Sequence, residues 1–132
     1  MNKDLMIQTI KESISDLIAV YQFGSQVTGK THKESDLDFA VLASAPIPPV
    51  QCFDLAQELA HLAKCAVDVV DLRQASTVMR MQVISTGTCL FSSNDVERER
   101  FETMVYSAYA RLNEERREIL KDIAQRGEVH AR

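Results

Sequence analysis

The sequence predicts a single α+β domain in which a mixed β-sheet carries helices on one side and is followed by a long C-terminal helix. Segments with apolar residues at helical spacing alternate with short β-prone runs, in the order helix–strand–strand–helix–strand–helix–strand–helix. The 132 residues correspond to one domain, with neither an internal repeat nor a linker. The last helical pattern is the longest, and it separates a core at 1–94 from a helix at 95–126.

Composition excludes a disordered, collagen-like or low-complexity chain and gives no sign of a membrane protein. Hydrophobic residues make up 45% of the chain and charged residues 26%, which is enough apolar material for a core. The formal net charge is −4, and the basic residues lie mainly in the last helix beside acidic ones, so we expect no direct nucleic-acid substrate. No apolar run approaches the 18 or so residues of a membrane span, and the N-terminus does not resemble a signal peptide.

The cysteines indicate a reducing compartment. Cys52, Cys65 and Cys89 are odd in number, and their spacing matches no zinc motif. We therefore expect a cytoplasmic protein in which all three thiols act as small buried hydrophobes.

The first half of the chain predicts a helix followed by two strands. The helical pattern covers 5–17, and the β-prone runs cover 18–23 and 37–42. Gly24 ends the first strand, and a loop with Pro46, Pro48 and Pro49 follows the second, since proline interrupts regular structure.

The second half predicts a helix at 53–64, a strand at 66–72, a further helix and a strand at 88–91. Ser76 or Thr77 is a good N-cap for the third helix, and Gly87 is a good residue for a left-handed C-terminal cap. Polar residues at 92–95 offer caps to the last helix, which the pattern extends to Gly127.

The last helix is too long for the domain. At about 1.5 Å per residue it would measure about 46 Å, whereas a domain of this length is about 36 Å across, so the helix must bend, break or overhang. An apolar stripe from Phe101 to Leu112 gives way to a polar stretch at 113–118, after which Leu120 and Ile123 resume it. Two interpretations remain open: a core helix with a solvated end, or a surface for another subunit.

Asp36 and Asp38 are the first candidates for catalysis. They lie two residues apart at the start of a strand, so both carboxylates point to one face and repel unless a cation lies between them. Such oxygen ligands suit Mg²⁺ or Mn²⁺ bound together with substrate phosphates. Upstream, the glycine backbone at Gly24 and the Ser25 hydroxyl can hold phosphate. Together the two halves indicate a nucleoside-triphosphate site.

A third carboxylate would complete a two-metal site, and two residues compete for the position. Asp68 is flanked by Val67 and Val69, where a buried, unpaired charge would be unfavourable. Asp71 lies on the opposite face at the strand end, where a capping or solvated role is easy. We favour Asp68.

Gly24-Ser25, ten intervening residues through Ser35, and Asp36-Leu37-Asp38 resemble the GSx10DxD signature of polymerase-β-type nucleotidyltransferases. The short chain resembles in particular the minimal nucleotidyltransferases, the antitoxins of HEPN–MNT toxin–antitoxin pairs. The segment at 67–70 matches the strand that carries the third acid in that superfamily, and the segment at 79–91 resembles its helix that ends in glycine before a short strand.

The chain departs from the family at Gln26 and Thr28, where arginines are common. Lys30 or Lys33 could replace their phosphate contacts. Arg80 is a further candidate for a phosphate contact, against the alternative of an ordinary surface arginine.

The resemblance implies an activity. ATP would be bound by Gly24, Ser25 and Ser35, and two Mg²⁺ ions, with Mn²⁺ as an alternative, by Asp36, Asp38 and Asp68. AMP would pass to a tyrosine hydroxyl of a partner HEPN ribonuclease, silencing that toxin and releasing pyrophosphate. Two alternatives remain: nucleotide transfer to a small molecule such as an aminoglycoside, and a non-catalytic antitoxin that masks its partner by contact.

Overall fold

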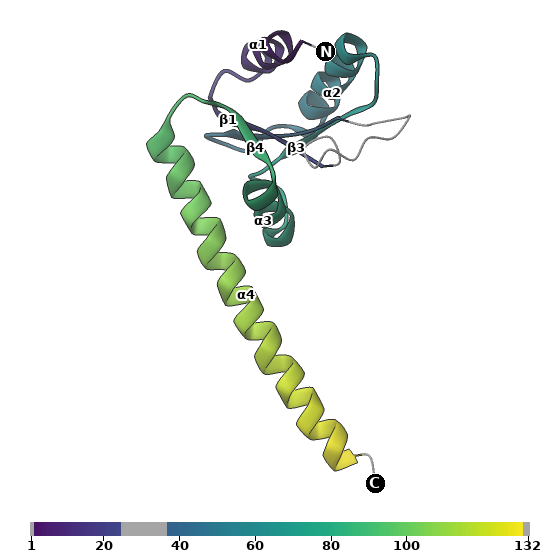
Figure 1. The fold of residues 1–132 in the computed structure, drawn as a ribbon, viewed down its shortest axis with the longest axis vertical. Coiled ribbons are helices and arrows are strands. Elements are labelled where there is room, and N and C mark those ends of the chain that lie inside the picture. Colours follow the sequence, from purple (N-terminus) through teal and green to yellow (C-terminus); the bar gives the residue numbers. More distant parts are fainter. Residues whose placement is uncertain (1, 25–36, 131–132) are drawn as a thin grey trace.

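The computed structural model describes the chain at residues 2–24 and 37–130. Four helices and four strands follow one another in the order that the sequence predicts (Figure 1). They are α1 (Lys3–Ser13), β1 (Leu17–Phe23), β2 (Leu37–Ala43), α2 (Pro49–Ala63), β3 (Val67–Asp71), α3 (Thr77–Thr86), β4 (Thr88–Ser92) and α4 (Asp95–His130).

The strands form one mixed sheet in the order β3-β2-β1-β4. β1 pairs antiparallel with both β2 and β4, whereas β2 and β3 run parallel. The two central strands are almost wholly buried, and the two edge strands are partly exposed. The predicted mixed sheet is thus confirmed.

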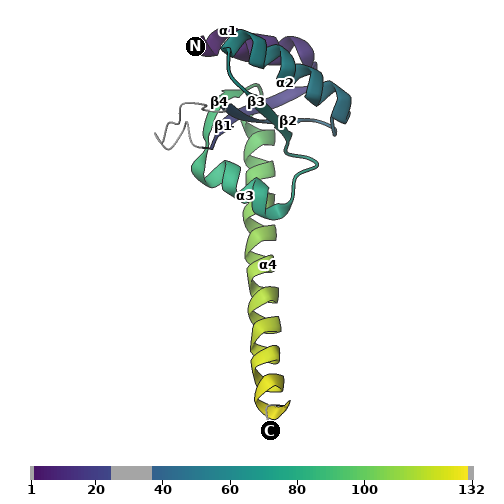
Figure 2. The ribbon, with the colours of Figure 1, turned by 90° about the vertical axis from the view of Figure 1, so that its right-hand side faces the viewer.

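Helices cover both faces of this sheet, so the expectation of helices on one side is wrong. α1 and α2 pack on one face, where Ile10 and Leu59 meet Phe39. α3 and the first turns of α4 pack on the other face, where Val83 and Phe101 belong to a separate core (Figures 1 and 2). The physical reason is that β1 and β2 carry apolar side chains at successive positions, which point alternately to the two faces and require cover on both.

Two predicted helix boundaries are wrong. α1 ends at Ser13 rather than Leu17, because Ile14 has already turned to extended backbone and Leu17 begins β1. α2 begins at Pro49, four residues before the predicted start, since proline at the first helical position loses no intrahelical hydrogen bond. Ser76 is the N-cap of α3, as expected, and accepts a hydrogen bond from the Met79 N–H.

Gly87 ends α3, but not in the left-handed conformation that the sequence predicts. Its backbone is extended, with φ −83°. A Cβ at this position would lie 2.5 Å from the Val83 carbonyl oxygen and 3.0 Å from the Gln22 carbonyl oxygen. Glycine is therefore required here because a side chain would collide with the last turn of α3 itself and would also crowd the backbone of β1.

α4 is one continuous helix that overhangs the domain. It starts after Asn94, whose side-chain oxygen accepts a hydrogen bond from the Glu97 N–H. Phe101 and Val105 are buried, whereas every residue from 114 to 126 is exposed. Figures 1 and 2 show the helix leaving the sheet and continuing well past α3. Of the three possibilities of bending, breaking and overhanging, the helix takes the last.

A partly buried hydrogen bond fixes the start of α4 to the sheet. The Tyr21 hydroxyl donates to the Glu102 carboxylate over 2.6 Å, and Glu102 also accepts from the Arg98 guanidinium at 3.1 Å. Burial, and then the hydrogen bond to Glu102, raise the pKa of Tyr21 far above its ordinary value. Tyr21 is therefore a neutral donor that holds β1 and α4 together.

None of the three cysteines is fully buried, so that expectation is wrong. Cys52 and Cys65 are half-buried, and Cys89 is exposed on β4. Cys89 lies on the short edge strand β4, where the first two residues are exposed. Within the part of the chain that the structure describes, no helix is long and apolar enough to cross a membrane.

Replacing Tyr21 by phenylalanine should lower the free energy of unfolding by about 1–2 kcal/mol, because Glu102 loses a buried hydrogen-bond donor. Tyr106 lies on the exposed side of α4, so Tyr106→Phe should change stability by less than about 0.5 kcal/mol. Urea unfolding monitored by circular dichroism measures both variants. Equal stabilities for the two would contradict an anchoring role for Tyr21.

Candidate active site

Asp38 and Asp68 lie side by side on neighbouring parallel strands. The register pairs Asp38 of β2 with Asp68 of β3, and strands in a sheet are about 4.8 Å apart. Paired residues of a parallel ladder point to the same face, and here it is the face that α3 and α4 cover, since Ala40 and Leu42 follow Asp38 at alternate positions and belong to that core. The fold thus brings together two of the predicted carboxylates, 30 residues apart in the sequence.

Gly24 lies directly against Asp38. It follows Phe23, the β1 partner of Asp38, and its φ of +89° is a conformation that side chains rarely adopt. A Cβ built on Gly24 would collide with Oδ2 of Asp38. The glycine therefore leaves room for the carboxylate at the end of β1.

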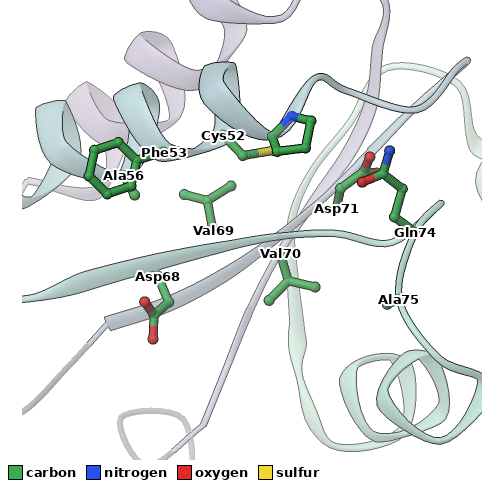
Figure 3. A pocket seen from close by; sticks show the side chains of 10 residues that line it. Cys52, Phe53, Ala56, Asp68, Val69, Val70, Asp71, Gln74 and Ala75 are labelled. Atoms are coloured by element: carbon green, nitrogen blue, oxygen red, sulfur yellow. The ribbon is translucent and has the colours of Figure 1, made fainter.

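Asp68 is exposed, so the expectation of a buried charge at this position is wrong. It lies at the start of an edge strand, which leaves its carboxylate in contact with solvent. Figure 3 shows that Asp68 and Val70 point to one side of β3, and Val69 and Asp71 to the other. The predicted alternation of Asp68 and Asp71 is therefore confirmed.

Asp71 has a structural role, as its position at the strand end suggested. Its side chain is only 7% exposed. One carboxylate oxygen accepts a hydrogen bond from the Ile47 N–H at 2.8 Å, and the other accepts one from the Arg73 N–H at 3.0 Å. These bonds fix the loops that follow β2 and β3, and they leave Asp68 as the β3 carboxylate next to Asp38.

The remaining signature residues lie outside the described residues. These are Ser25, Ser35 and Asp36, together with the loop positions Gln26, Thr28, Lys30 and Lys33. The shared direction of Asp36 and Asp38, and the phosphate contacts of Ser25 and Ser35, therefore stay predictions.

Arg80 is held by backbone carbonyls. Its guanidinium donates to the Leu72 carbonyl at 2.6 Å and to the Arg73 carbonyl at 2.7 Å, and it lies 5.4 Å from the centre of the Phe101 ring. These contacts link the β3–α3 connection to α4. Arg80 therefore has a structural role.

The donor set fits a divalent cation that also binds a substrate. Carboxylate oxygens are hard ligands of the kind that Mg²⁺ and Mn²⁺ prefer. Across residues 2–24 and 37–130, however, no group of three or more His, Cys, Asp or Glu side chains could hold a metal ion. Asp38 and Asp68 would thus hold a metal with further oxygens, for which phosphate and the predicted ligand Asp36 are suitable.

A groove that the sequence analysis missed runs along the outer edge of β3 (Figure 3). It has a volume of about 400 Å³, and Asp68 is one of its lining residues. α2 contributes Cys52, Phe53 and Ala56, and the segment after β3 contributes Gln74 and Ala75. The sequence feature that could have indicated this groove is Phe53, an apolar residue of the predicted second helix. Its side chain is 62% exposed in the structure.

Two strand-borne carboxylates beside a glycine turn, on a mixed sheet covered by helices on both faces, are the arrangement expected of a nucleotidyltransferase domain. The family model described as "Polymerase beta, Nucleotidyltransferase" matches residues 6–96. The chain therefore belongs to the polymerase-β nucleotidyltransferase family.

Several proteins are similar to this chain over most of its length. The chain is 37% identical, over 93% of its length and 88% of the relative's, to protein adenylyltransferase MntA of Shewanella oneidensis strain MR-1. It is 36% identical to a chain of a toxin–antitoxin crystal structure with AMP-PNP, with a TM-score of 0.84, covering 94% of this chain and 99% of the other.

A third relative comes from the structure of the tri-AMPylated Shewanella oneidensis HEPN toxin in complex with MNT antitoxin. The identity is 34% and the TM-score is 0.77, over 92% of this chain and 95% of the other. The resemblance to minimal nucleotidyltransferases is thus confirmed.

Asp71 and Asp68 should respond differently to truncation. Asp71→Ala should lower the free energy of unfolding by about 1–3 kcal/mol, because two backbone N–H groups lose a buried acceptor. Asp68→Ala removes an exposed carboxylate and should change it by less than about 0.5 kcal/mol. Denaturant unfolding of both variants at pH 7 tests the assignment, and a larger loss for Asp68→Ala would overturn it.

Proposed function

We propose that this chain is an antitoxin that transfers AMP from ATP to a tyrosine hydroxyl of a HEPN ribonuclease toxin and thereby neutralises the toxin. The observation that carries the proposal is the Asp38–Asp68 pair beside Gly24, in a chain 37% identical to a protein adenylyltransferase. The AMP-PNP in one related structure and the AMPylated HEPN toxin in another support ATP as donor and a protein as acceptor.

Each residue of the site has a defined task in this proposal. Gly24, Ser25 and Ser35 hold the phosphates of ATP, while Asp36, Asp38 and Asp68 hold two Mg²⁺ ions. Metal ions held by these carboxylates would supply Lewis acidity to the reaction. Asp68, exposed at the edge of the sheet, faces the side from which an acceptor can approach.

The transfer is a single displacement at the α-phosphorus. The phenol oxygen forms a bond to phosphorus as the bond to the pyrophosphate oxygen breaks, and pyrophosphate leaves. A free phenol has a pKa of about 10, so its proton must be removed during the attack. Asp68 is the described carboxylate on the acceptor side and would receive that proton before passing it to solvent.

The exposed part of α4 favours a protein acceptor over a small molecule. Among residues 2–24 and 37–130, α4 is the element that extends beyond the sheet and its covering helices, and its residues 114–126 are exposed. A helix that leaves the domain encloses no pocket for an aminoglycoside-like substrate. It does present Ile119, Leu120 and Ile123, each more than half exposed, to another protein. We therefore assign α4, expected at 95–126, as the toxin-binding helix, with the exposed overhang at 114–126 as the surface that contacts the toxin.

The alternative function is a binding antitoxin without catalysis. A contact-only inhibitor would need neither a carboxylate pair in register nor a glycine shaped around one of them. Loss of the carboxylates separates the two functions, because a contact-only inhibitor would still neutralise its toxin.

Removal of the carboxylates should abolish AMP transfer. The chain is incubated with α-³²P-labelled ATP, Mg²⁺ and the HEPN protein from the same genome, and intact mass is measured in parallel. Asp36→Ala/Asp38→Ala and Asp68→Asn should each lower the labelling rate by at least about 100-fold, since developing charge on the phosphates is no longer stabilised. Asp54→Ala, an exposed carboxylate on α2, should label at the wild-type rate.

A mass gain on the HEPN protein in units of AMP, absent with the double variant, would support the proposal. Absence of label with every form, together with equal inhibition of the ribonuclease by the wild type and the double variant, would leave the binding antitoxin instead.

A charge on the overhanging helix should weaken toxin binding. Ile123→Asp introduces a carboxylate into the exposed apolar residues of the overhang, whereas Val96→Asp does so at the other end of the same helix. If the overhang binds the toxin, the Kd measured by calorimetry should rise about tenfold or more for Ile123→Asp only, as expected at an interface core. Equal Kd values for the wild type and both variants would contradict the assignment of the toxin-binding helix.

A further inference from the structure

The outer backbone of β3 faces away from the sheet. The Leu37 N–H donates to the Ala66 carbonyl, and the Leu72 N–H donates to the Val41 carbonyl. Successive residues of a strand direct their N–H and C=O groups to opposite sides, so residues of the same parity as 66 and 72 bond to β2. Val67 and Val69 therefore direct their backbone groups outward, where the sheet of described strands has no further neighbour.

The groove lies along this outward edge. α2 overhangs it with Cys52, Ala56 and the exposed ring of Phe53, while Val69 points up toward α2 in Figure 3. β3 has five residues, which span about 16 Å at the usual rise of a strand. The groove thus combines a line of backbone donors and acceptors with an apolar roof, which is the arrangement that binds an extended peptide as an added strand.

The charges of the groove disfavour a nucleotide. Its described lining residues include two carboxylates, Asp68 and Asp71, and neither lysine nor arginine. A triphosphate lying along the groove, away from the proposed metal ions, would face these carboxylates without a compensating side chain. A peptide with neutral backbone amides and apolar side chains meets no such repulsion.

We propose that the β3-edge groove binds an extended segment of the protein acceptor, which adds as a fifth strand beside β3 and carries the hydroxyl to Asp68. The inference rests on the proposed function and adds the mode of acceptor binding to it. We choose the acceptor as the occupant because the groove is continuous with the proposed catalytic site: Asp68 belongs both to the carboxylate pair and to the lining of the groove. The other edge strand, β4, is separated from β2 by β1, so a strand added there would lie far from the carboxylates.

Phe53→Asp and Val50→Asp form a matched pair for the test. Both wild-type residues are exposed and apolar and lie on α2, but only Phe53 lines the groove. Wild-type AMP transfer to the HEPN protein is established first, because its absence would mean failure of the proposed function rather than of the groove. Steady-state labelling then gives KM values for the HEPN protein and for ATP.

Phe53→Asp should raise the KM for the HEPN protein by about tenfold or more, as for a residue at the centre of an interface, and leave the KM for ATP within about twofold. Val50→Asp should change neither. An unchanged KM for the HEPN protein in Phe53→Asp would overturn the inference. A raised KM for ATP alone would also overturn it, since the groove would then hold the nucleotide.

Hydrogen–deuterium exchange gives a second measurement that needs no groove variant. In the complex of Asp36→Ala/Asp38→Ala with the HEPN protein, the outward amide of Val69 should exchange at least about tenfold more slowly than in the free chain, because a strand hydrogen bond would protect it. Unchanged exchange at Val69, in a complex whose formation is confirmed by size-exclusion chromatography, would contradict the added strand.

Discussion

The parallel register of β2 and β3 is the constraint on which the site depends. It places Asp38 opposite Asp68, and no local feature of either segment could do so. Gly24 adds a second requirement, because its positive φ and missing side chain leave space for the Asp38 carboxylate at the end of β1. Three elements that are distant in the sequence therefore converge on one carboxylate, and a slip of one residue in the β2–β3 register would turn the pair to opposite faces.

The two covering layers keep that register and define the exposed surfaces of the domain. α1 and α2 bury one face of the sheet, and α3 with the start of α4 buries the other. Asp71 and Arg80 hold the connections around β3 through backbone groups, which leaves Asp68 and the edge of the strand open. Tyr21 and Glu102 fix the start of α4, so the overhang projects from a defined point. The residues that stabilise these segments are therefore different from Asp38 and Asp68, the two carboxylates proposed for catalysis.

The order of the elements was predictable from the sequence because it depends on local periodicity. Asp38 and Asp68 could be named as candidates, but their position side by side depends on the β2–β3 register. The cover on both faces was harder to predict, since the continuous burial of β1 and β2 can also be read as ordinary strand hydrophobicity. Gly87 was expected to be left-handed, yet glycine is needed there because the Val83 carbonyl of its own helix lies closest and the Gln22 carbonyl of β1 lies beside it. The β3-edge groove was not predictable, because it depends on which strand lies at the edge.

We propose that Asp38 and Asp68 act together on a metal-bound nucleotide. A crystal structure of the chain with Mn²⁺ and a non-hydrolysable ATP analogue, with anomalous data to locate manganese, is the sharpest test. We expect a manganese peak within about 2.2 Å of oxygens from both carboxylates and from the nucleotide phosphates. Manganese and phosphates bound elsewhere, with Asp38 and Asp68 contacting neither, would contradict it.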